Sequence, residues 1–227
     1  MLYNIIDRIY IGHIPGSGAL ALTGVGVCMP LIMIISAFAA LVGNGGAPRA
    51  SILMGKKDLD SAENILGNCF TMQIIISVIL TLIMFFGNRT FLMAFGASEN
   101  TIEYAVSYMN IYSLGTIFVQ LTLGMNAFIT AQGFAKTGMY SVLIGAVINI
   151  ILDPIFIFAC HMGVRGAALA TIISQACSCI WVLSFLFGTR STLRIKKQNL
   201  TLKAPVILPC CLLYTSDAAD EARSVDL

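Results

Sequence analysis

Long apolar stretches separated by short polar joints dominate the pattern of this chain. The stretches run for about 20 residues or more, which is the length that an α-helix needs to cross a hydrocarbon core about 30 Å thick. We expect a partial span at Met1–His13, which looks like the second half of a helix, followed by complete spans. The complete spans are predicted at Leu20–Asn44, Ala62–Phe86, Thr101–Thr130, Met139–Cys160 and Gly166–Phe187.

The composition supports the same class of protein. Hydrophobic residues make up 58% of the chain and charged residues 11%, with a mean hydropathy of +0.88. A soluble domain would alternate apolar core positions with a charged exterior, and the strands of a membrane barrel would alternate over about ten residues. Neither pattern is present, so the sequence predicts an all-α membrane protein with about six transmembrane helices.

Basic residues gather at every second joint between the predicted spans. The intervening joints carry only Arg89 and Arg165. The positive-inside rule therefore places the basic joints and the N-terminus in the cytoplasm, in a multi-pass protein of the plasma membrane or a bacterial inner membrane. We expect no binding to nucleic acid, and we expect the run Arg190–Lys203 to be a solvated loop. The basic joints carry Arg49, Lys56, Lys57, Lys136, Arg190, Arg194, Lys196, Lys197 and Lys203.

No catalytic or metal-binding motif stands out. The seven cysteines include no C-x-x-C pair, and His13 and His161 are isolated from other ligand types in the sequence. The chain also has no G-x-S-x-G, H-E-x-x-H or phosphate-binding glycine loop. We therefore expect no enzyme activity and no cofactor.

An acidic side chain inside an apolar helix is costly, and in INIILDPIFIF one stands at Asp153. Asn149 lies four residues earlier and so on the same helical face. Pro154 has no N–H, which leaves the carbonyl of Ile150 without its usual helical partner. A carboxylate, an amide and a carbonyl on one wall suit a small cation or a titrating proton. The alternative is that Asp153 only caps a broken helix, or pairs with an arginine such as Arg8 or Arg165.

Other polar groups lie on three further predicted spans. Asp7 is the only acid in the first. Thr122, Asn126 and Thr130 form a stripe at i, i+4 spacing on the fourth, and Ala167, Thr171 and Gln175 form another on the sixth. Hydroxyls and amides in membrane helices often only bond a neighbouring helix, and this interpretation stays open for both stripes.

Several motifs together resemble the N-terminal lobe of the multidrug and toxic compound extrusion (MATE) family. Their order and spacing match over about residues 1–205, and YNIIDRI is similar to the bacterial drug-exporting branch. The motifs are YNIIDRIYIGHIPG at Tyr3–Gly16, NGGAPRASILMGKKD at Asn44–Asp58, MNAFITAQGFAKTGM at Met125–Met139, INIILDPIFIF at Ile148–Phe158 and GVRGAALATIISQ at Gly163–Gln175.

The resemblance implies a secondary active antiporter with twelve helices in two pseudo-symmetric lobes, which exports drugs or organic cations in exchange for Na⁺ or H⁺. Its implied partners are the lipid bilayer, an amphipathic or cationic small molecule, and a second lobe that is missing from these 227 residues. It also implies a cation or proton site, with Na⁺ or H⁺ held at Asp7 and Asp153. The site residues carried over are Asp7, Asn126, Asn149, Asp153 and Thr171.

The resemblance further divides the chain. Residues 1–209 are expected to form the N-terminal lobe, with a truncated first helix and the start of a seventh at the end. Residues 210–227 are interpreted as a non-native tail, because CLLYTSDAADE at Cys211–Glu221 is similar to the translation of a transposase adapter used in sequencing libraries.

Two other functions stay open at this point. A lipid-linked oligosaccharide flippase has a related architecture, but it would show a basic central cavity, for which only Arg8 is a candidate. A membrane module without a transport cycle is the second, because one lobe alone lacks the opposite wall of a transport cavity. The sequence does not choose between Na⁺ and H⁺, since carboxylates serve both.

Overall fold

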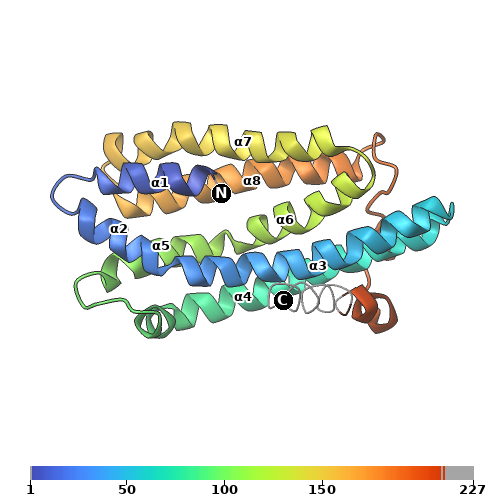
Figure 1. The fold of residues 1–227 in the computed structure, drawn as a ribbon, viewed down its shortest axis with the longest axis horizontal. Coiled ribbons are helices and arrows are strands. Elements are labelled where there is room, and N and C mark those ends of the chain that lie inside the picture. Colours follow the sequence, from blue (N-terminus) through green and yellow to red (C-terminus); the bar gives the residue numbers. More distant parts are fainter. Residues whose placement is uncertain (1, 211, 213–227) are drawn as a thin grey trace, which may run out of the picture. The chain divides into compact units, whose positions relative to one another are not determined.

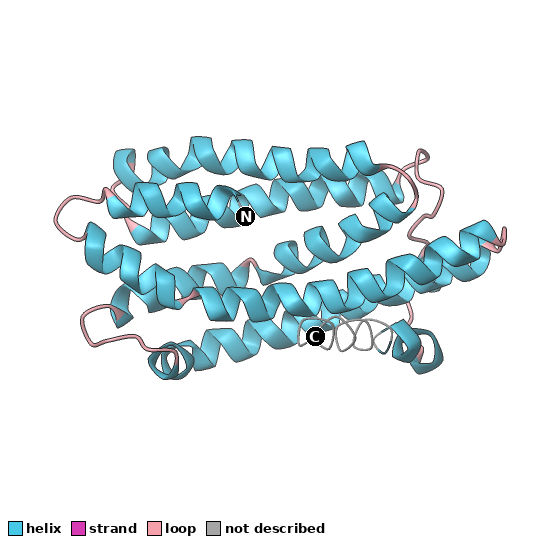
Figure 2. Ribbon diagram, in the orientation of Figure 1, coloured by secondary structure: helices cyan, strands magenta, loops and turns pink. Residues whose placement is uncertain are grey.

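A computed structural model describes residues 2–210 and 212, and the described residues form helices joined by short loops, with no strand among them (Figure 2). The order of the helices can be followed by colour in Figure 1. The α-helices are α1 (Leu2–Gly12), α2 (Gly18–Val27), α3 (Met29–Gly55), α4 (Leu59–Ala94), α5 (Ile102–Leu114), α6 (Thr116–Ala131), α7 (Ala135–Pro154) and α8 (Val164–Phe187). A π-helix, η1 (Ile155–Ala159), follows α7, a short 3₁₀-helix, η2, covers Lys197–Asn199, and residues 204–210 are helical.

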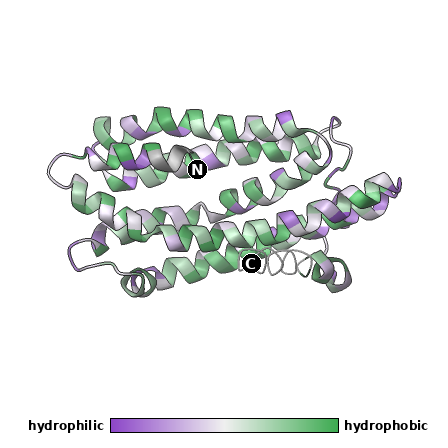
Figure 3. Cartoon of the chain, viewed as in Figure 1, coloured by the Kyte–Doolittle hydropathy of each residue, from purple (hydrophilic) through white to green (hydrophobic). Residues whose placement is uncertain are grey.

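The predicted complete spans are confirmed. Four helical stretches are long and apolar enough to cross a membrane, and the pair α5 and α6 makes a fifth if the two count as one bent span. Figure 3 shows hydrophobic residues along these helices and hydrophilic residues gathered toward the loops. Helix α1 has 11 residues. The four unbent stretches are Gly18–Gly55, Leu59–Ala94, Ala135–Ala159 and Val164–Phe187.

The predicted span Thr101–Thr130 is not one straight helix. It breaks at Gly115, where α5 and α6 meet at an angle of 58°. A Cβ added to Gly115 would lie 2.5 Å from Cγ1 of Ile172 on α8. The backbone at Gly115 is therefore too close to the Ile172 side chain for a residue with a Cβ to fit without a shift. Glycine is also a weak helix former, and the combination places the kink at this residue.

The end of α7 departs from α-helical geometry beside Asp153. Pro154 is the last residue of α7, and the next five residues form the π-helix η1. In this segment the N–H of Cys160 donates to the carbonyl of Ile155 at 2.8 Å. The helix therefore changes type directly after the Asp-Pro pair, and single π turns within helices often mark functional sites.

The chain divides into two compact units, which we describe separately. Unit 1 consists of Met1–Ile35, Ser77–Val119 and Val142–Ser178. Unit 2 consists of Ser36–Ile76, Gln120–Ser141 and Cys179–Leu227. Residues 211 and 213–227, which hold almost all of the tail interpreted as non-native, lie outside the described residues.

In unit 1, helix α2 packs against α1 and α5. A Cβ at Gly24 would lie 2.9 Å from the carbonyl oxygen of Thr101, so glycine permits close contact between α2 and the start of α5. The buried Cys28 thiol donates to the carbonyl of Ala105 at 3.5 Å. Small residues thus let α2 and α5 pack closely against each other, which is common between helices in membranes.

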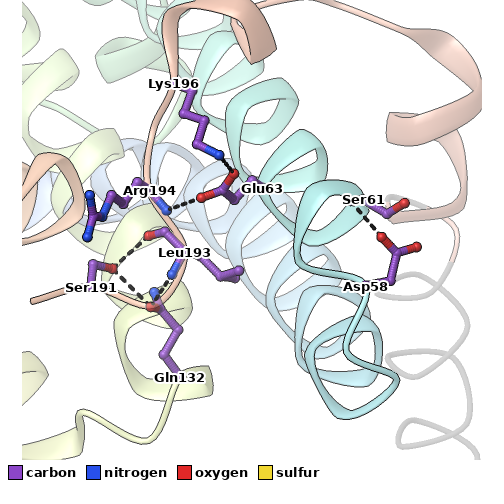
Figure 4. A network of polar contacts seen from close by, with 8 residues as sticks. All are labelled: Asp58, Ser61, Glu63, Gln132, Ser191, Leu193, Arg194 and Lys196. Carbon is purple, nitrogen blue, oxygen red and sulfur yellow. Dashed lines mark hydrogen bonds and ion pairs between the residues drawn. The ribbon is translucent and has the colours of Figure 1, made fainter. Parts of the chain in front are cut away.

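In unit 2, the segment 188–203 that follows α8 forms a strap fixed by side chains of two helices (Figure 4). Its residues alternate, with Ser191, Leu193 and Ile195 buried and Thr192 and Arg194 exposed. This segment was predicted as a solvated loop. Its basic side chains are largely exposed, but its backbone is held against the protein.

Three buried or half-buried polar side chains hold the strap. Gln132 Oε1 accepts the N–H of Leu193 at 2.8 Å and the Ser191 hydroxyl at 2.9 Å. Glu63 accepts the N–H of Arg194 at 3.2 Å and forms an ion pair with Lys196. Asn68 Oδ1 accepts the N–H of Lys203 at 2.7 Å. The backbone donors of an extended segment are thereby satisfied without a sheet.

Candidate cation-binding site

Four of the five predicted site residues lie together in unit 1. Asp7 comes from α1, Asn149 and Asp153 from α7, and Thr171 from α8. All four are buried, with exposed fractions of 3% for Asp7, 2% for Thr171 and 0% for the other two. Helix α1 and the distant, consecutive helices α7 and α8 thus bring two acids and their helper groups into one protein interior.

Hydrogen bonds connect each acid to one helper. The Thr171 hydroxyl donates to Oδ2 of Asp7 at 3.1 Å, and it has the carbonyl of Ala167 as a second acceptor at 3.0 Å. Asn149 Nδ2 donates to Oδ1 of Asp153 at 3.3 Å, which is the i, i+4 contact that the sequence predicts. Each acid therefore has one oxygen fixed in place by a neutral donor.

The two acids also interact with each other. The side chains of Asp7 and Asp153 are close enough to interact, and Asn149 also interacts with Asp7. Two carboxyl groups at this separation cannot both carry an uncompensated charge, because like charges repel strongly in a medium of low dielectric constant. A proton shared between them, or a cation bound by both, relieves that repulsion.

Three buried oxygen atoms of this cluster have no hydrogen-bond donor among the described residues. They are Oδ1 of Asp7, Oδ2 of Asp153 and Oδ1 of Asn149. A buried polar atom without a partner costs about 1 to 3 kcal/mol, and more if it is charged. Oxygen atoms of this kind are the ligands that hard cations prefer, so the cluster has the donor set for a small cation or a proton.

No arginine neutralises the pair in the described part of the chain. The ion pairs found there join Arg89 to Glu103 and Lys196 to Glu63. The alternative that Asp153 pairs with Arg8 or Arg165 is therefore not what this structure shows. A buried acid pair without a basic partner is expensive to keep for stability alone, which favours a functional role.

Asn126, the fifth predicted residue, belongs to unit 2, and its contacts given by the structure lie there. The side-chain Nδ2 of Asn126 donates to the carbonyl of Gly138 at 3.4 Å, and the backbone carbonyl of Asn126 accepts a hydrogen bond from the Thr130 hydroxyl at 3.2 Å. It lines a cavity of about 660 Å³ together with Asn44 and Ser51. The contacts of unit 1 therefore assemble the cluster from the other four residues.

Sequence reasoning missed Tyr108 on α5. Its ring is buried, stacks on Tyr112 at a centroid distance of 5.9 Å, and its hydroxyl interacts with the side chain of Thr171. Tyr104, Tyr108 and Tyr112 recur at i, i+4 spacing, so they share one helical face. That tyrosine stripe is the signal that the sequence offers for this residue.

These features define a bundle of membrane-spanning helices with a buried pair of acids, and comparison with known proteins identifies the family. The MatE family model matches residues 1–155. The chain belongs to the MatE family.

Relatives by sequence are bacterial exporters. The multidrug export protein MepA of Staphylococcus haemolyticus is 30% identical over 199 residues, which cover 88% of this chain and 44% of that protein. MepA of Staphylococcus aureus is 25% identical over 205 residues, covering 90% of this chain and 44% of that protein. The chain thus spans about half the length of the curated relatives that it matches.

Solved structures agree on the fold. An inward-facing multidrug resistance MATE family transporter of the MOP superfamily superposes with a TM-score of 0.85 at 27% identity, over 92% of this chain and 47% of that one. An outward-facing transporter of the same description superposes with a TM-score of 0.83 at 26% identity, over 92% of this chain and 46% of that one. A similar score against two transport states indicates that the lobe keeps its fold in both.

Proposed function

We propose that this chain is one lobe of a secondary active antiporter that exports drugs or organic cations in exchange for Na⁺ or H⁺. The observation that carries the proposal is the buried pair of Asp7 and Asp153 without a basic partner among the described residues. The names of the bacterial relatives support drug export. A lipid flippase would need a basic cavity, which nothing in the described site supports.

The coupling ion binds where the two acids face each other. Three buried oxygens would coordinate a bound cation: Oδ1 of Asp7, Oδ2 of Asp153 and Oδ1 of Asn149. The Thr171 hydroxyl and the Asn149 amide each hold one carboxylate oxygen and so fix the orientation of both acids. A bound proton would bridge the same two carboxyl groups.

Binding of the ion changes which packing of the helices is stable. With the acids charged and unpaired, arrangements that let water reach them are favoured, whereas occupancy removes that cost and favours a closed packing of α1, α7 and α8. The π-helix after Pro154 gives α7 a place to adjust beside the site. An organic substrate attracted by the charged acids would then be released when the ion neutralises them.

The exchange cycle also needs a partner and an orientation. The solved relatives are about twice as long as this chain, and we propose that a second lobe supplies the opposite wall of the substrate path. By the positive-inside rule, the basic joints support an N-terminus in the cytoplasm, and we propose that orientation. The chain itself then contributes the ion site, while substrate export requires both lobes.

Cation binding can be tested on the chain itself, because the four clustered residues lie in one unit. In detergent, ²²Na⁺ binding and infrared detection of a protonated carboxyl group should reveal one of the two ions at a single site. Asp7→Asn and Asp153→Asn should each remove the signal, and Glu99→Gln, which changes an exposed acid before α5, should not. Absence of both signals in the unmodified chain would reject the site.

Export is tested in a full-length transporter that carries this lobe. Asp153→Asn should abolish drug-resistance export while leaving membrane insertion intact, because only the coupling ion is lost. Driving efflux of a fluorescent cation from vesicles with a Na⁺ gradient and then with a pH gradient identifies the ion. Undiminished efflux by Asp153→Asn at normal expression would contradict the proposed role.

A further inference from the structure

A groove in unit 2 combines aromatic walls with a charged end. It has a volume of about 440 Å³ and lies between the start of α7 and the end of α8. Its apolar walls include Phe134, Trp181 and Phe185, with Ser184 beside them on α8, and its polar end includes Thr189 and Arg190. Phe134 and Phe185 meet edge to face at a centroid distance of 5.0 Å, which gives the floor of the groove a fixed shape.

The groove runs from the apolar zone of the membrane toward its surface. Helix α8 has 24 residues and is about 36 Å long, slightly more than a hydrocarbon core. Trp181 stands about 9 Å before the end of α8, whereas Arg190 follows that end by three residues. The Trp181 N–H donates to the carbonyl of Thr137 at 3.2 Å, and tryptophan is enriched at this depth, where lipid chains meet headgroups.

Arg190 is the cation that the strap leaves available at this groove. Arg194 donates from Nη2 to the carbonyl of Thr189 at 3.1 Å, and Lys196 is paired with Glu63. Within the described residues, Arg190 has no hydrogen bond or ion pair assigned to it, and it is exposed. Its guanidinium is suited to bidentate contact with a phosphate group.

We propose that this groove binds an anionic phospholipid. The phosphate binds Arg190, with the Thr189 hydroxyl as a second donor, and an acyl chain lies along Phe134, Phe185 and Trp181. Free phosphate would use the charged end only and leave the aromatic walls exposed. Basic pockets beside membrane helices are suited to such headgroups, and the positive-inside orientation places this one at the cytoplasmic leaflet, where anionic lipids are enriched.

Native mass spectrometry of the purified chain, with phosphatidylglycerol or phosphatidylcholine added, tests the proposal. We expect one phosphatidylglycerol to bind more tightly than phosphatidylcholine. Arg190→Gln should weaken phosphatidylglycerol binding about fivefold, because one basic group near the surface contributes about that factor. The matched control is Lys197→Gln, which removes the same charge from the same strap outside the groove and should leave the affinity unchanged.

The apolar half of the groove needs its own variant. Ser184→Phe places a ring in the groove from an exposed position on α8, so it should block lipid binding while Arg190 stays in place. Circular dichroism and size-exclusion chromatography check that each variant is folded. Equal affinity in Arg190→Gln and the unmodified chain, equal loss in Lys197→Gln, or displacement of the lipid by millimolar inorganic phosphate would each overturn the proposal.

Discussion

Replacing Glu63 tests how the strap of unit 2 is held against the helices (Figure 4). The Glu63 carboxylate is 5% exposed, accepts the N–H of Arg194 at 3.2 Å and pairs with Lys196. Glu63→Ala removes both contacts and leaves the N–H of Arg194 without an acceptor. Glu63→Gln keeps a side-chain oxygen for that N–H and removes only the charge.

The magnitudes follow from these contacts. A part-buried N–H that loses its acceptor costs about 1 to 3 kcal/mol. The ion pair contributes less, about 0 to 1 kcal/mol, because the Lys196 side chain is 42% exposed and water screens it. We therefore expect the free energy for local opening of the strap to fall by about 1 to 4 kcal/mol in Glu63→Ala and by less than about 1 kcal/mol in Glu63→Gln.

Limited trypsin digestion in detergent measures this opening. The strap carries cleavage sites at Arg194, Lys196 and Lys197, and cleavage requires its backbone to leave the protein surface. When opening is fast compared with cleavage, the rate follows the open population, so a loss of 2 kcal/mol speeds cleavage about 30-fold. The exposed turn at Lys56 and Lys57 provides an internal control whose cleavage rate should not change.

Two results would refute this reasoning. Equal cleavage of the strap in Glu63→Ala and Glu63→Gln would mean that the bond to the Arg194 N–H contributes little. Equal acceleration at Lys56 would mean that the substitution loosens the whole unit rather than the strap.

Three further predictions follow from other contacts. Thr171→Val should weaken cation binding about tenfold by removing the donor to Asp7, whereas Thr171→Ser should retain it, as measured by ²²Na⁺ titration. Gly115→Ala should lower the free energy of unfolding by about 1 to 3 kcal/mol, because the added methyl group overpacks against Ile172. Gly26→Ala is the control, because its methyl group would meet open space. Thermal unfolding of both variants in detergent measures the difference. Hydrogen bonds from the Ser61 hydroxyl and N–H lower the pKa of Asp58. The contribution of Asp58 to stability is therefore present above the ordinary carboxyl pKa of about 4 and is lost as the pH falls through the lowered value. Asp58→Asn should remove that acid sensitivity, as measured by the melting temperature at a series of pH values.

Local rules were enough to predict the spans and one contact of the site. The presence and approximate positions of the spans follow from hydropathy alone, although Gly18–Gly55 and Leu59–Ala94 extend beyond the predicted bounds. The bond between Asn149 and Asp153 follows from helical periodicity. The contact of Thr171 with Asp7 joins residues 164 positions apart, and only the resemblance to a family suggested it. A single sequence carries no direct record of which helices are neighbours.

The features that were missed depend on tertiary packing. The break at Gly115 is set by the side chain of Ile172, and the strap is set by polar side chains from elsewhere in unit 2, such as Gln132. The break leaves no periodic signal in its own segment, and the strap leaves only a short alternation of apolar and polar residues. Tyr108 did leave a periodic signal, but a buried tyrosine in an apolar helix fits ordinary packing equally well.

The π-helix Ile155–Ala159 has a consequence for comparing relatives of this protein. A π turn accommodates one residue more than an α-turn, and one residue corresponds to about 100° of rotation around a helix. The chain leaves the helix at Cys160, so the extra residue shifts only the side chains of the last turn, Ile155–Ala159, away from the faces that a regular α-helix would give them. An alignment with a relative whose helix stays regular here needs a one-residue gap within this segment to pair residues of the same helical face.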